Sequence, residues 1–376
     1  MRIGIDASRI PTAQRTGTEN YSFEMIKALC AIAQLSANAG KDREFVLYFN
    51  SPPPQEMLEG FEGCEIKNIP FPRLWTHIRL SMEMALKRPD VLFVPAHVIP
   101  LVHPKRSVVT IHDMGHLYYP ETYPKSTLRY LKWATRHNIS SSSSIIADSE
   151  STKRDIIKHY PQAAEKTFVV YPGVSPDFRP VSDEGTIQRV RQNYGIPGEY
   201  FLYVGTIHPR KNLERLLRAY SSFVSKVTGP RPRLVLVGKK GWLPEGIMRQ
   251  LDEIDAEVTM AGFVPQEDLP ALYSGAIALL LSSLFEGFGL PVVEAMACGT
   301  PVMAANSSSL PEIVCDAGLL TDPMDIEEMA EAMHWLWGKP ALRQELSERG
   351  LKRAADFTWQ GAAETTLRVL ERRDHK

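Results

Sequence analysis

The sequence has few cysteines, almost no net charge and no long hydrophobic run. Its four cysteines are scattered over 376 residues without a CxxC pair: Cys30, Cys64, Cys298 and Cys315. We therefore expect buried reduced thiols rather than a disulfide framework or a zinc site. The formal net charge is −1, so no overall basic field attracts nucleic acid and any anion site must be local. The longest apolar run, residues 276–281, is far shorter than the roughly 18 residues of a membrane-spanning helix.

Several enzyme fingerprints are also absent. No GxGxxG follows an expected strand and no GxxxxGK[ST] occurs, which argues against a dinucleotide dehydrogenase and a P-loop NTPase. Neither GxSxG nor HExxH is found. The N-terminal run MRIGIDASRI contains Asp6, which is not typical of a signal peptide. We expect a cytoplasmic protein, and peripheral contact with the inner face of the membrane stays open.

Short apolar runs alternate with amphipathic ones in both halves of the chain. Most of the runs are apolar throughout rather than alternating, as in parallel strands that are covered on both faces. They predict strands within 2–8, 44–50, 90–96, 107–113, 144–149 and 167–173, and within 201–207, 233–239, 257–263, 276–282, 301–305 and 318–322. This alternation predicts two doubly wound α/β domains, with ligands outside the carboxyl ends of the strands. The Pro- and Gly-rich stretch near residues 171–185 predicts the linker.

Two stretches of the second half suggest an anion site. Asn212 is a typical N-cap residue, so we expect a helix to begin near it, directly after Arg210 and Lys211. Cations at a helix start oppose the helix dipole unless an anion is bound. Residues 285–302, FEGFGLPVVEAMACGTPV, place Gly287 and Gly289 before a second helix start, where free backbone N–H groups bind anions. Two solvated turns remain the simpler alternative for these patterns.

Two acids lie on either side of this second turn. A carboxylate is repelled by phosphate, so Glu286 and Glu294 are expected to accept hydrogen bonds from neutral hydroxyl groups. A ligand with a diphosphate at its centre and hydroxyls at both ends fits this arrangement, as a nucleotide sugar does. Pro291 suits the first turn of the expected helix.

These segments together resemble the family 4 retaining glycosyltransferases. EGFGLPVVEAMACGTPV looks like the E-x7-E motif of that family, VGTIHPRKNLERLLRAY its phosphate-binding lysine segment, and AGFVPQEDLPALYSGA the segment that lines the nucleobase. VTIHD, ADSESTKRDI and FTWQGAAE match further segments. The segment TIHDMGHLYYPETYP is most similar to bacterial mannosyltransferases of O-antigen and related polysaccharide synthesis. Two departures are the loop Thr16-Gly17-Thr18-Glu19, which also matches a capping box, and Thr206, where many relatives carry arginine.

The resemblance implies a GT-B fold, in which two Rossmann-like domains with parallel sheets face each other across a cleft. An acceptor-side domain would span residues 1–172 and be joined by the last helix, 358–376. A linker, 173–185, would lead to the nucleotide-sugar domain, 186–357.

The resemblance also implies the roles of the site residues. Glu286, His112, Lys211 and Arg210 would be catalytic. Gly17, Val264, Gly287, Phe288, Gly289, Leu290 and Glu294 would bind the donor.

The expected reaction is retaining transfer of a hexose, with mannose favoured, to a glycan or lipid-linked acceptor in bacterial polysaccharide synthesis. No cofactor and no metal are expected, because fixed cations would stabilise the leaving diphosphate; the favoured co-substrate is GDP-mannose. Two alternatives remain: a nucleotide-sugar-binding protein without turnover, and a GT-B epimerase. The basic, aromatic segment 123–137 fits either a membrane surface or an ordinary exposed helix.

Overall fold

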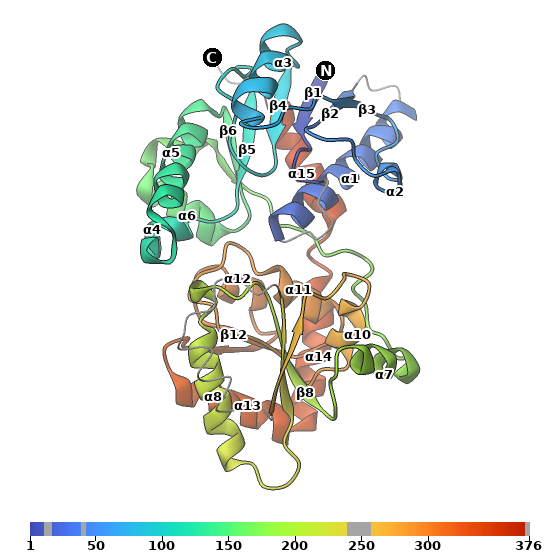
Figure 1. Cartoon of the computed structure of the whole chain (residues 1–376), viewed down its shortest axis with the longest axis vertical. Helices are drawn as coiled ribbons and strands as arrows, with labels where there is room; N and C mark the ends of the chain where they lie inside the picture. The colour runs from blue at the N-terminus through green and yellow to red at the C-terminus, as the bar shows by residue number, and fades with distance from the viewer. Residues whose placement is uncertain (11–16, 39–42, 239–256, 373–376) are drawn as a thin grey trace. The chain divides into compact units, whose positions relative to one another are not determined.

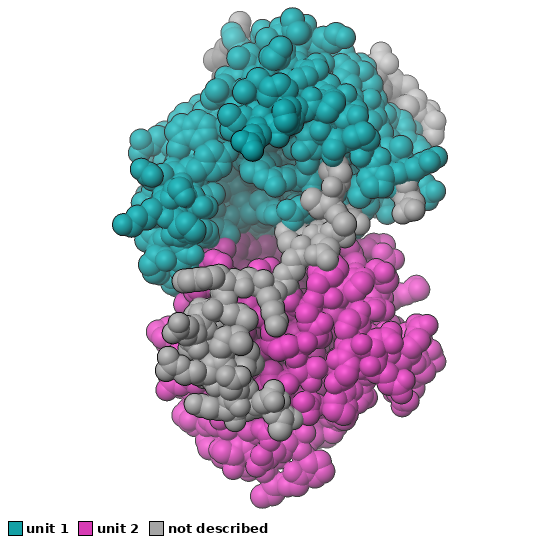
Figure 2. Space-filling view, viewed as in Figure 1, with its two compact units in different colours: residues 1–173, 358–376 teal, residues 174–357 magenta. Residues whose placement is uncertain are grey.

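The computed structural model describes residues 1–10, 17–38, 43–238 and 257–372, which form two compact units. The first unit consists of Met1–Gly173 and Thr358–Lys376, and the second of Val174–Phe357 (Figures 1 and 2). Residues 174–185, most of the expected linker, belong to the second unit in this division.

Each unit is built on one sheet whose strand pairs are all parallel. In the described residues, the first sheet has seven strands in the order β3-β2-β1-β4-β5-β6-β7. The second has six in the order β10-β9-β8-β11-β12-β13. The strands of the first sheet are β1 (Arg2–Asp6), β2 (Glu44–Phe49), β3 (Cys64–Asn68), β4 (Val91–Val94), β5 (Ser107–Ile111), β6 (Ser144–Ala147) and β7 (Thr167–Val169). Those of the second are β8 (Tyr200–Val204), β9 (Arg233–Val237), β10 (Val258–Gly262), β11 (Leu279–Leu281), β12 (Val302–Ala305) and β13 (Leu319–Thr321).

Helices lie in most of the connections between these parallel strands, whereas the described connection from β4 to β5, residues 95–106, contains none. The α-helices of the first unit are α1 (Gly17–Asn38), α2 (Gln55–Leu58), α3 (Ser81–Leu86), α4 (Gly115–Tyr118), α5 (Lys125–Ser141), α6 (Glu150–His159) and α15 (Trp359–Glu371). Those described in the second unit are α7 (Glu184–Asn193), α8 (Leu213–Lys226), α10 (Leu269–Ser274), α11 (Leu290–Ala297), α12 (Leu310–Val314), α13 (Ile326–Gly338) and α14 (Pro340–Ala354). A π-helix, Thr76–Leu80, leads into α3, and 3-10 helices span Pro120–Thr122, Pro161–Lys166 and Pro209–Lys211.

The predicted apolar patterns account for the core. β4 and β5 are buried along their whole length, as expected for strands covered on both faces. The helix that follows Lys211 is amphipathic: Leu213, Leu217 and Phe223 are among the buried residues of α8.

Strand β3 was not predicted. Among the described strands it pairs only with β2, at the edge of the first sheet, and its sequence CEIKN is mostly exposed. An edge strand with few apolar side chains has no run that periodicity can detect, because it buries little.

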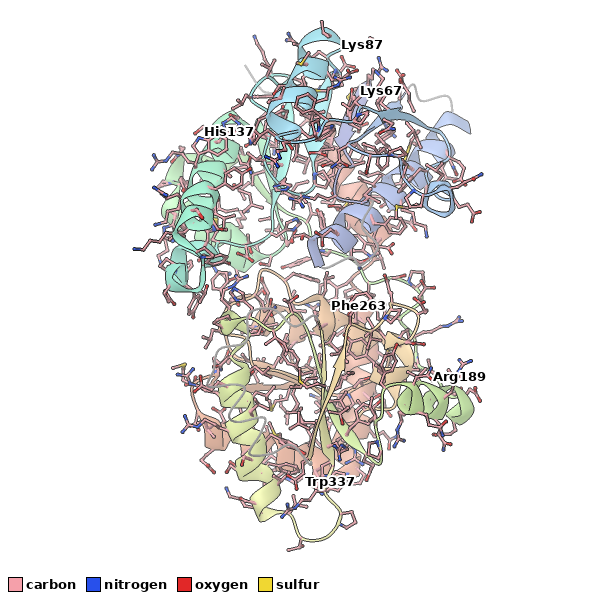
Figure 3. The ribbon with its side chains drawn as sticks, viewed as in Figure 1. Lys67, Lys87, His137, Arg189, Phe263 and Trp337 are labelled. Carbon is pink, nitrogen blue, oxygen red and sulfur yellow. A yellow bond between two sulfur atoms is a disulfide. The ribbon has the colours of Figure 1, made fainter. Side chains whose placement is uncertain are left out.

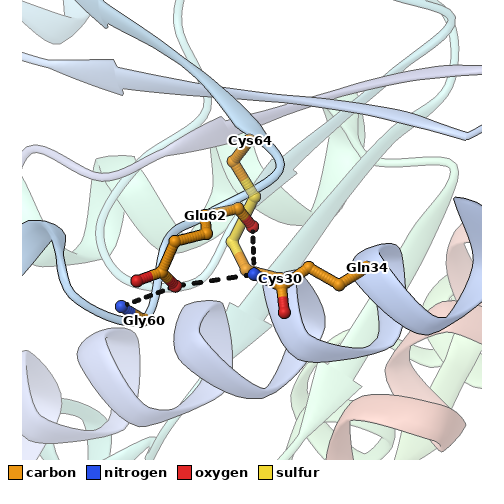
Figure 4. Close-up of a disulfide and its surroundings, with 5 residues drawn as sticks. All are labelled: Cys30, Gln34, Gly60, Glu62 and Cys64. Atoms are coloured by element: carbon orange, nitrogen blue, oxygen red, sulfur yellow. Dashed lines mark hydrogen bonds between the residues drawn. A yellow bond between two sulfur atoms is a disulfide. The ribbon is translucent and has the colours of Figure 1, made fainter.

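The cysteine prediction was wrong in two respects. Cys30 on α1 and Cys64 at the start of β3 form a disulfide, with their Cα atoms 6.3 Å apart (Figure 4). The pair is 34 residues apart in the sequence and carries no spacing signal, so only the packing of α1 against β3 brings the sulfurs together. Of the two free cysteines, Cys298 is buried but Cys315 is exposed.

The chain passes between the units at Gly173 and again at Phe357. The backbone is crowded here, because a Cβ atom on Gly173 would lie 2.1 Å from the backbone N of Trp359. Val174 N donates a hydrogen bond to Phe357 O at 3.0 Å. Beyond this point α15 buries Trp359 and Leu370 in the core of the first unit.

No helix in the described residues is long and apolar enough to cross a membrane.

Candidate active site

The two anion-site stretches of the sequence meet at the carboxyl edge of the second sheet. Pro209–Lys211 follows β8, and Glu286 lies in the loop between β11 and α11. Because β8 and β11 are paired neighbours, with Leu202 opposite Leu279, the loops that follow them lie side by side.

Lys211 and Glu286 form an ion pair across these loops. Lys211 Nζ lies 2.5 Å from Glu286 Oε1, and the Ser283 hydroxyl donates to the same oxygen at 2.7 Å. Glu286 N donates to Ser308 Oγ at 2.8 Å. The two charged side chains keep only 20% and 12% of their surface exposed, so solvent screens the pair weakly.

The backbone around Arg210 joins the two loops. Leu284 N donates to Arg210 O at 2.8 Å. Asn212 does precede α8, but it does not cap the helix as expected. Its backbone is left-handed, with φ 57°, and its buried amide donates to Ser282 O and Pro323 O instead. Asn212 therefore fastens the basic turn to the loops after β11 and β13.

Gly289 stands directly before α11, as the sequence predicts. Its φ is 104°, which only glycine adopts easily, and an added Cβ atom would lie 2.7 Å from a Leu310 methyl carbon. Leu290 is the first residue of α11 and Pro291 the second. The proline has no N–H of its own, and Val292 N already donates to Gly289 O at 2.9 Å, so Leu290 N is the N–H group of the first turn that could face a ligand.

Glu294 lies one turn into α11, where Tyr273 donates its hydroxyl to Oε2 at 2.9 Å. Burial raises the pKa of Glu294 to about 7, although the Tyr273 hydrogen bond lowers it. This carboxyl group can therefore change its charge near neutral pH.

The other predicted donor-binding residues differ in their exposure and in the unit to which they belong. The Phe288 side chain is buried against Phe357, with ring centroids 5.5 Å apart, so only its backbone is available to a ligand. Val264 is buried after β10, beside the half-exposed Phe263 that Figure 3 labels. Gly17 is the exposed first residue of α1, in the first unit. Thr16, the N-cap residue of the expected capping box, lies outside the described residues.

His112 follows β5 in the first unit. Its Nδ1 lies 2.6 Å from Asp148 Oδ2, and its Nε2 is buried. Tyr21 packs edge-on against the imidazole at 4.7 Å. Burial lowers the pKa of His112, but the Asp148 carboxylate more than offsets this, so the net pKa is raised.

A pocket of about 390 Å³ opens beside His112. Its lining lies entirely within the first unit and includes Arg9, Glu19, His97 and Tyr130. His97 has a left-handed backbone, with φ 99°, which is uncommon for a residue other than glycine. A pocket lined by an aromatic ring, a cation and several imidazoles is suited to a polar ligand with hydroxyl groups.

Comparison with known proteins assigns both units. Residues 37–178 match the model for Glycosyltransferase Family 4, and residues 187–353 match that for Glycosyl transferases group 1. The O-antigen chain mannosyltransferase B of Escherichia coli is 34% identical over 270 residues, covering 71% of this chain and 70% of that protein. The chain belongs to the family 4 glycosyltransferases. The serotype-specific mannosyltransferase WbdA of Escherichia coli is 27% identical over 284 residues, which are 74% of this chain but only 34% of WbdA.

Solved structures identify the fold of this glycosyltransferase as GT-B. Anabaena Alr3699/HepE in complex with UDP-glucose aligns with a TM-score of 0.74 and 19% identity over 98% of this chain and 99% of that one. WaaG, a glycosyltransferase involved in lipopolysaccharide biosynthesis, aligns with a TM-score of 0.71 and 16% identity over 98% of this chain and 99% of that one.

Sequence reasoning missed three partners of the site residues in this glycosyltransferase: Asp148, Tyr273 and Ser283. Asp148 had a usable signal. It directly follows β6, whose Ala147 pairs with Ile111 of β5, so Asp148 and His112 are the next residues on neighbouring strands. Tyr273 and Ser283 carry no such signal, because a tyrosine or serine near a strand end is common. Among the described residues, no group of three or more His, Cys, Asp or Glu side chains is placed to hold a metal ion.

Proposed function

We propose that this glycosyltransferase moves a hexose, mannose by preference, from a nucleotide diphosphate sugar to a glycan or lipid-linked acceptor. The observation that carries the proposal is the Lys211–Glu286 pair beside the amino end of α11. The choice of mannose, and of GDP-mannose as the donor, rests on the names of the Escherichia coli relatives.

The donor diphosphate would lie between the basic turn and α11. Arg210, Lys211 and backbone N–H groups near Gly289 would stabilise the charge that develops on the leaving diphosphate. Stabilisation of this kind is usually the largest single contribution to catalysis. Because Lys211 is held by Glu286, its ammonium group is already positioned when the donor binds. These fixed cations are the reason for proposing that transfer needs no divalent metal.

Two carboxyl groups would hold the two ends of the donor. Glu286 would accept hydrogen bonds from hydroxyls of the transferred sugar. Glu294 would accept one from the ribose, since the Tyr273 hydroxyl already donates to its Oε2 and Oε1 remains for the ligand. His112 would supply a polar contact from the first unit, through Nε2. With no nucleophile assigned, we propose retention of configuration by same-face attack, in which the leaving phosphate takes the acceptor proton.

A screen of donors tests the proposal. The purified protein is incubated with GDP-mannose, UDP-glucose and other nucleotide sugars, and release of the nucleoside diphosphate is followed with and without EDTA. We expect slow hydrolysis that is fastest with GDP-mannose, unaffected by EDTA and lost in Lys211→Ala. Magnesium-dependent activity would contradict the metal-independent reaction.

The same screen separates the two alternatives. Tight binding of a nucleotide sugar without release of the diphosphate would indicate a non-catalytic binding protein. Conversion of one nucleotide sugar into its epimer would indicate an epimerase. Once an acceptor is identified, the anomeric proton coupling of the product tests retention.

A further inference from the structure

An exposed apolar stripe runs along the helical segment Thr76–Leu86 of the first unit. Ile78, Met82 and Leu86 stand four residues apart, and their exposed fractions are 39%, 52% and 77%. Residues at this spacing share one face of a helix. The opposite side is anchored, because Leu80 and Met84 are buried in the core. The stripe is therefore an outward face that the fold leaves uncovered within the first unit.

A hydrogen bond joins this helical segment to the loop before β5. Val102 N donates to Ser81 Oγ at 3.2 Å, at the start of α3. This places Leu101 and Val102, whose exposed fractions are 55% and 46%, next to the stripe.

Helix α5 continues the same surface. The Tyr130 hydroxyl lies 3.4 Å from His77 Nε2, and Trp133 stacks on His137 with ring centroids 5.3 Å apart. His137 Nε2 also lies 3.0 Å from Ile99 O, and this hydrogen bond connects α5 to the loop before β5. Figure 3 labels Lys87, just after α3, and His137 on α5. We call the stripe with Leu101, Val102 and Trp133 the apolar patch.

The charged residues around the apolar patch are almost all positive. Residues 69–88, 97–106 and 123–137 contain ten lysines and arginines and a single acid, Glu83, although the whole chain has a net charge of −1. Glu83 is buried, and it pairs with Lys67 at 3.3 Å and Arg79 at 3.2 Å. Lys87, Arg88 and Lys132 are exposed. The surface thus combines exposed Leu, Met and Trp side chains with a surplus of cations.

We propose that the apolar patch binds the surface of an anionic lipid bilayer. Apolar side chains that enter the headgroup region, surrounded by lysine and arginine that meet anionic lipid, are the pattern of a peripheral membrane surface. Trp133 and Tyr130 have the amphipathic rings that favour the membrane–water interface. A second copy of the chain fits less well, because it would bring two cationic surfaces together.

The patch also leads into the pocket beside His112. Tyr130 lies at 41% exposure beside the patch and lines the pocket as well. Docking through the patch brings the pocket mouth close to the bilayer surface, where the head of a lipid-linked acceptor would lie. This last step rests on the proposed function; the docking itself does not.

Vesicle binding tests the proposal with a matched pair of variants. The first variant carries Met82→Glu and Leu86→Glu. The control carries Met324→Glu and Leu35→Glu, which change the same residue types at similar exposure, 56% and 70%, away from the patch. Each protein is sedimented with vesicles of phosphatidylcholine alone or mixed with phosphatidylglycerol. Urea unfolding verifies that both variants remain folded.

We expect the wild type and the control to bind the mixed vesicles and to bind phosphatidylcholine alone weakly. The patch variant should bind at least about tenfold more weakly, since two apolar side chains no longer leave water. Binding should weaken as salt is added, because surface charges are screened within about 10 Å at 0.1 M ionic strength. Equal binding by all three proteins, or none by the wild type, would overturn the proposal. The proposal would also be overturned if the wild type formed a dimer that the patch variant does not form, and if neither protein bound vesicles.

Donor hydrolysis in solution keeps the two proposals apart. The patch variant should hydrolyse GDP-mannose at the wild-type rate, because the changed residues lie outside the donor site. Loss of vesicle binding with normal hydrolysis supports the docking surface. Vesicle binding without any hydrolysis would leave the docking surface standing and contradict the proposed transferase reaction.

Discussion

Removing the Lys211 ammonium group is the most direct test of the candidate site. Lys211→Ala takes away a cation that lies 2.5 Å from Glu286 Oε1 and is only 20% exposed. A charge in such a shielded place contributes about 2–4 kcal/mol to the transition state. At 1.36 kcal/mol per factor of ten, kcat/KM for the donor should fall about 30- to 1000-fold.

The fold should survive this substitution. Ser283 still donates to Glu286, so the carboxylate keeps a partner. We expect a loss of about 1–3 kcal/mol of unfolding free energy, because a mostly buried carboxylate loses one hydrogen-bond donor. Lys226→Ala is the matched control: it removes a lysine that is paired with Glu327 at 2.8 Å in the same unit, but more than half of its side chain is exposed.

Steady-state hydrolysis of GDP-mannose and urea unfolding measure the two quantities for both variants. In the control variant, Lys226→Ala, kcat/KM and the free energy of unfolding should both stay close to the wild-type values. A Lys211→Ala enzyme that keeps kcat/KM within threefold of the wild type would refute the phosphate role of this residue. A large loss of stability instead of activity would show that the ion pair serves the fold alone.

Three further predictions follow from buried contacts. Gly173→Ala should destabilise the protein by about 3 kcal/mol or more in urea unfolding, because its Cβ would meet the backbone of α15 at 2.1 Å; Gly338→Ala, with open space around it, should not. Asp148→Asn should lower the pKa of His112 measured by NMR, since it removes the charge that offsets burial. Glu294 has a folded-state pKa of about 7 against an ordinary value of 4.5, so the unfolded state loses its proton first as pH rises. Stability should therefore fall between about pH 4.5 and 7, and Glu294→Gln should remove that part of the fall; an unchanged pH profile would contradict the raised pKa.

Much of the fold could be predicted because burial on both faces leaves a continuous apolar run. Residues 91–94, VLFV, illustrate this: every residue is buried, and the run is found without any knowledge of its neighbours. The edge strand β3 shows the limit, since a strand that buries little leaves little pattern in the sequence. The Cys30–Cys64 disulfide joins that same strand to α1, so missing the strand also hid the geometry that would have suggested the bond.

The sequence suggested individual candidate residues for the site, but not which of their side chains would pair. Charge at a helix start marked Lys211, and the glycine turn marked the region of Glu286; nothing local indicated that the two side chains would meet. Asn212 was assigned a capping role because that is what asparagine does most often before a helix. In the structure its amide instead holds the loops after β11 and β13, a role that depends on strand order rather than on local sequence.

Strand order is therefore the information that turns separate candidates into a site. His112 and Asp148 stand 36 residues apart, yet they occupy equivalent positions at the ends of β5 and β6 because Ile111 pairs with Ala147. The same reasoning applies to β8 and β11, which bring Lys211 to Glu286. In a parallel sheet each strand delivers its next residues to one edge, so a correct register predicts which polar residues can touch.

Two substitutions at the carboxyl edge of the second sheet should accordingly depend on each other. The effect of Glu286→Gln on kcat/KM should be smaller in a Lys211→Ala background than in the wild type, because each substitution removes one partner of the same interaction. Additive effects in that double-mutant cycle would mean that the two residues act on the donor independently, and that their contact in the free protein has no part in positioning the ammonium group.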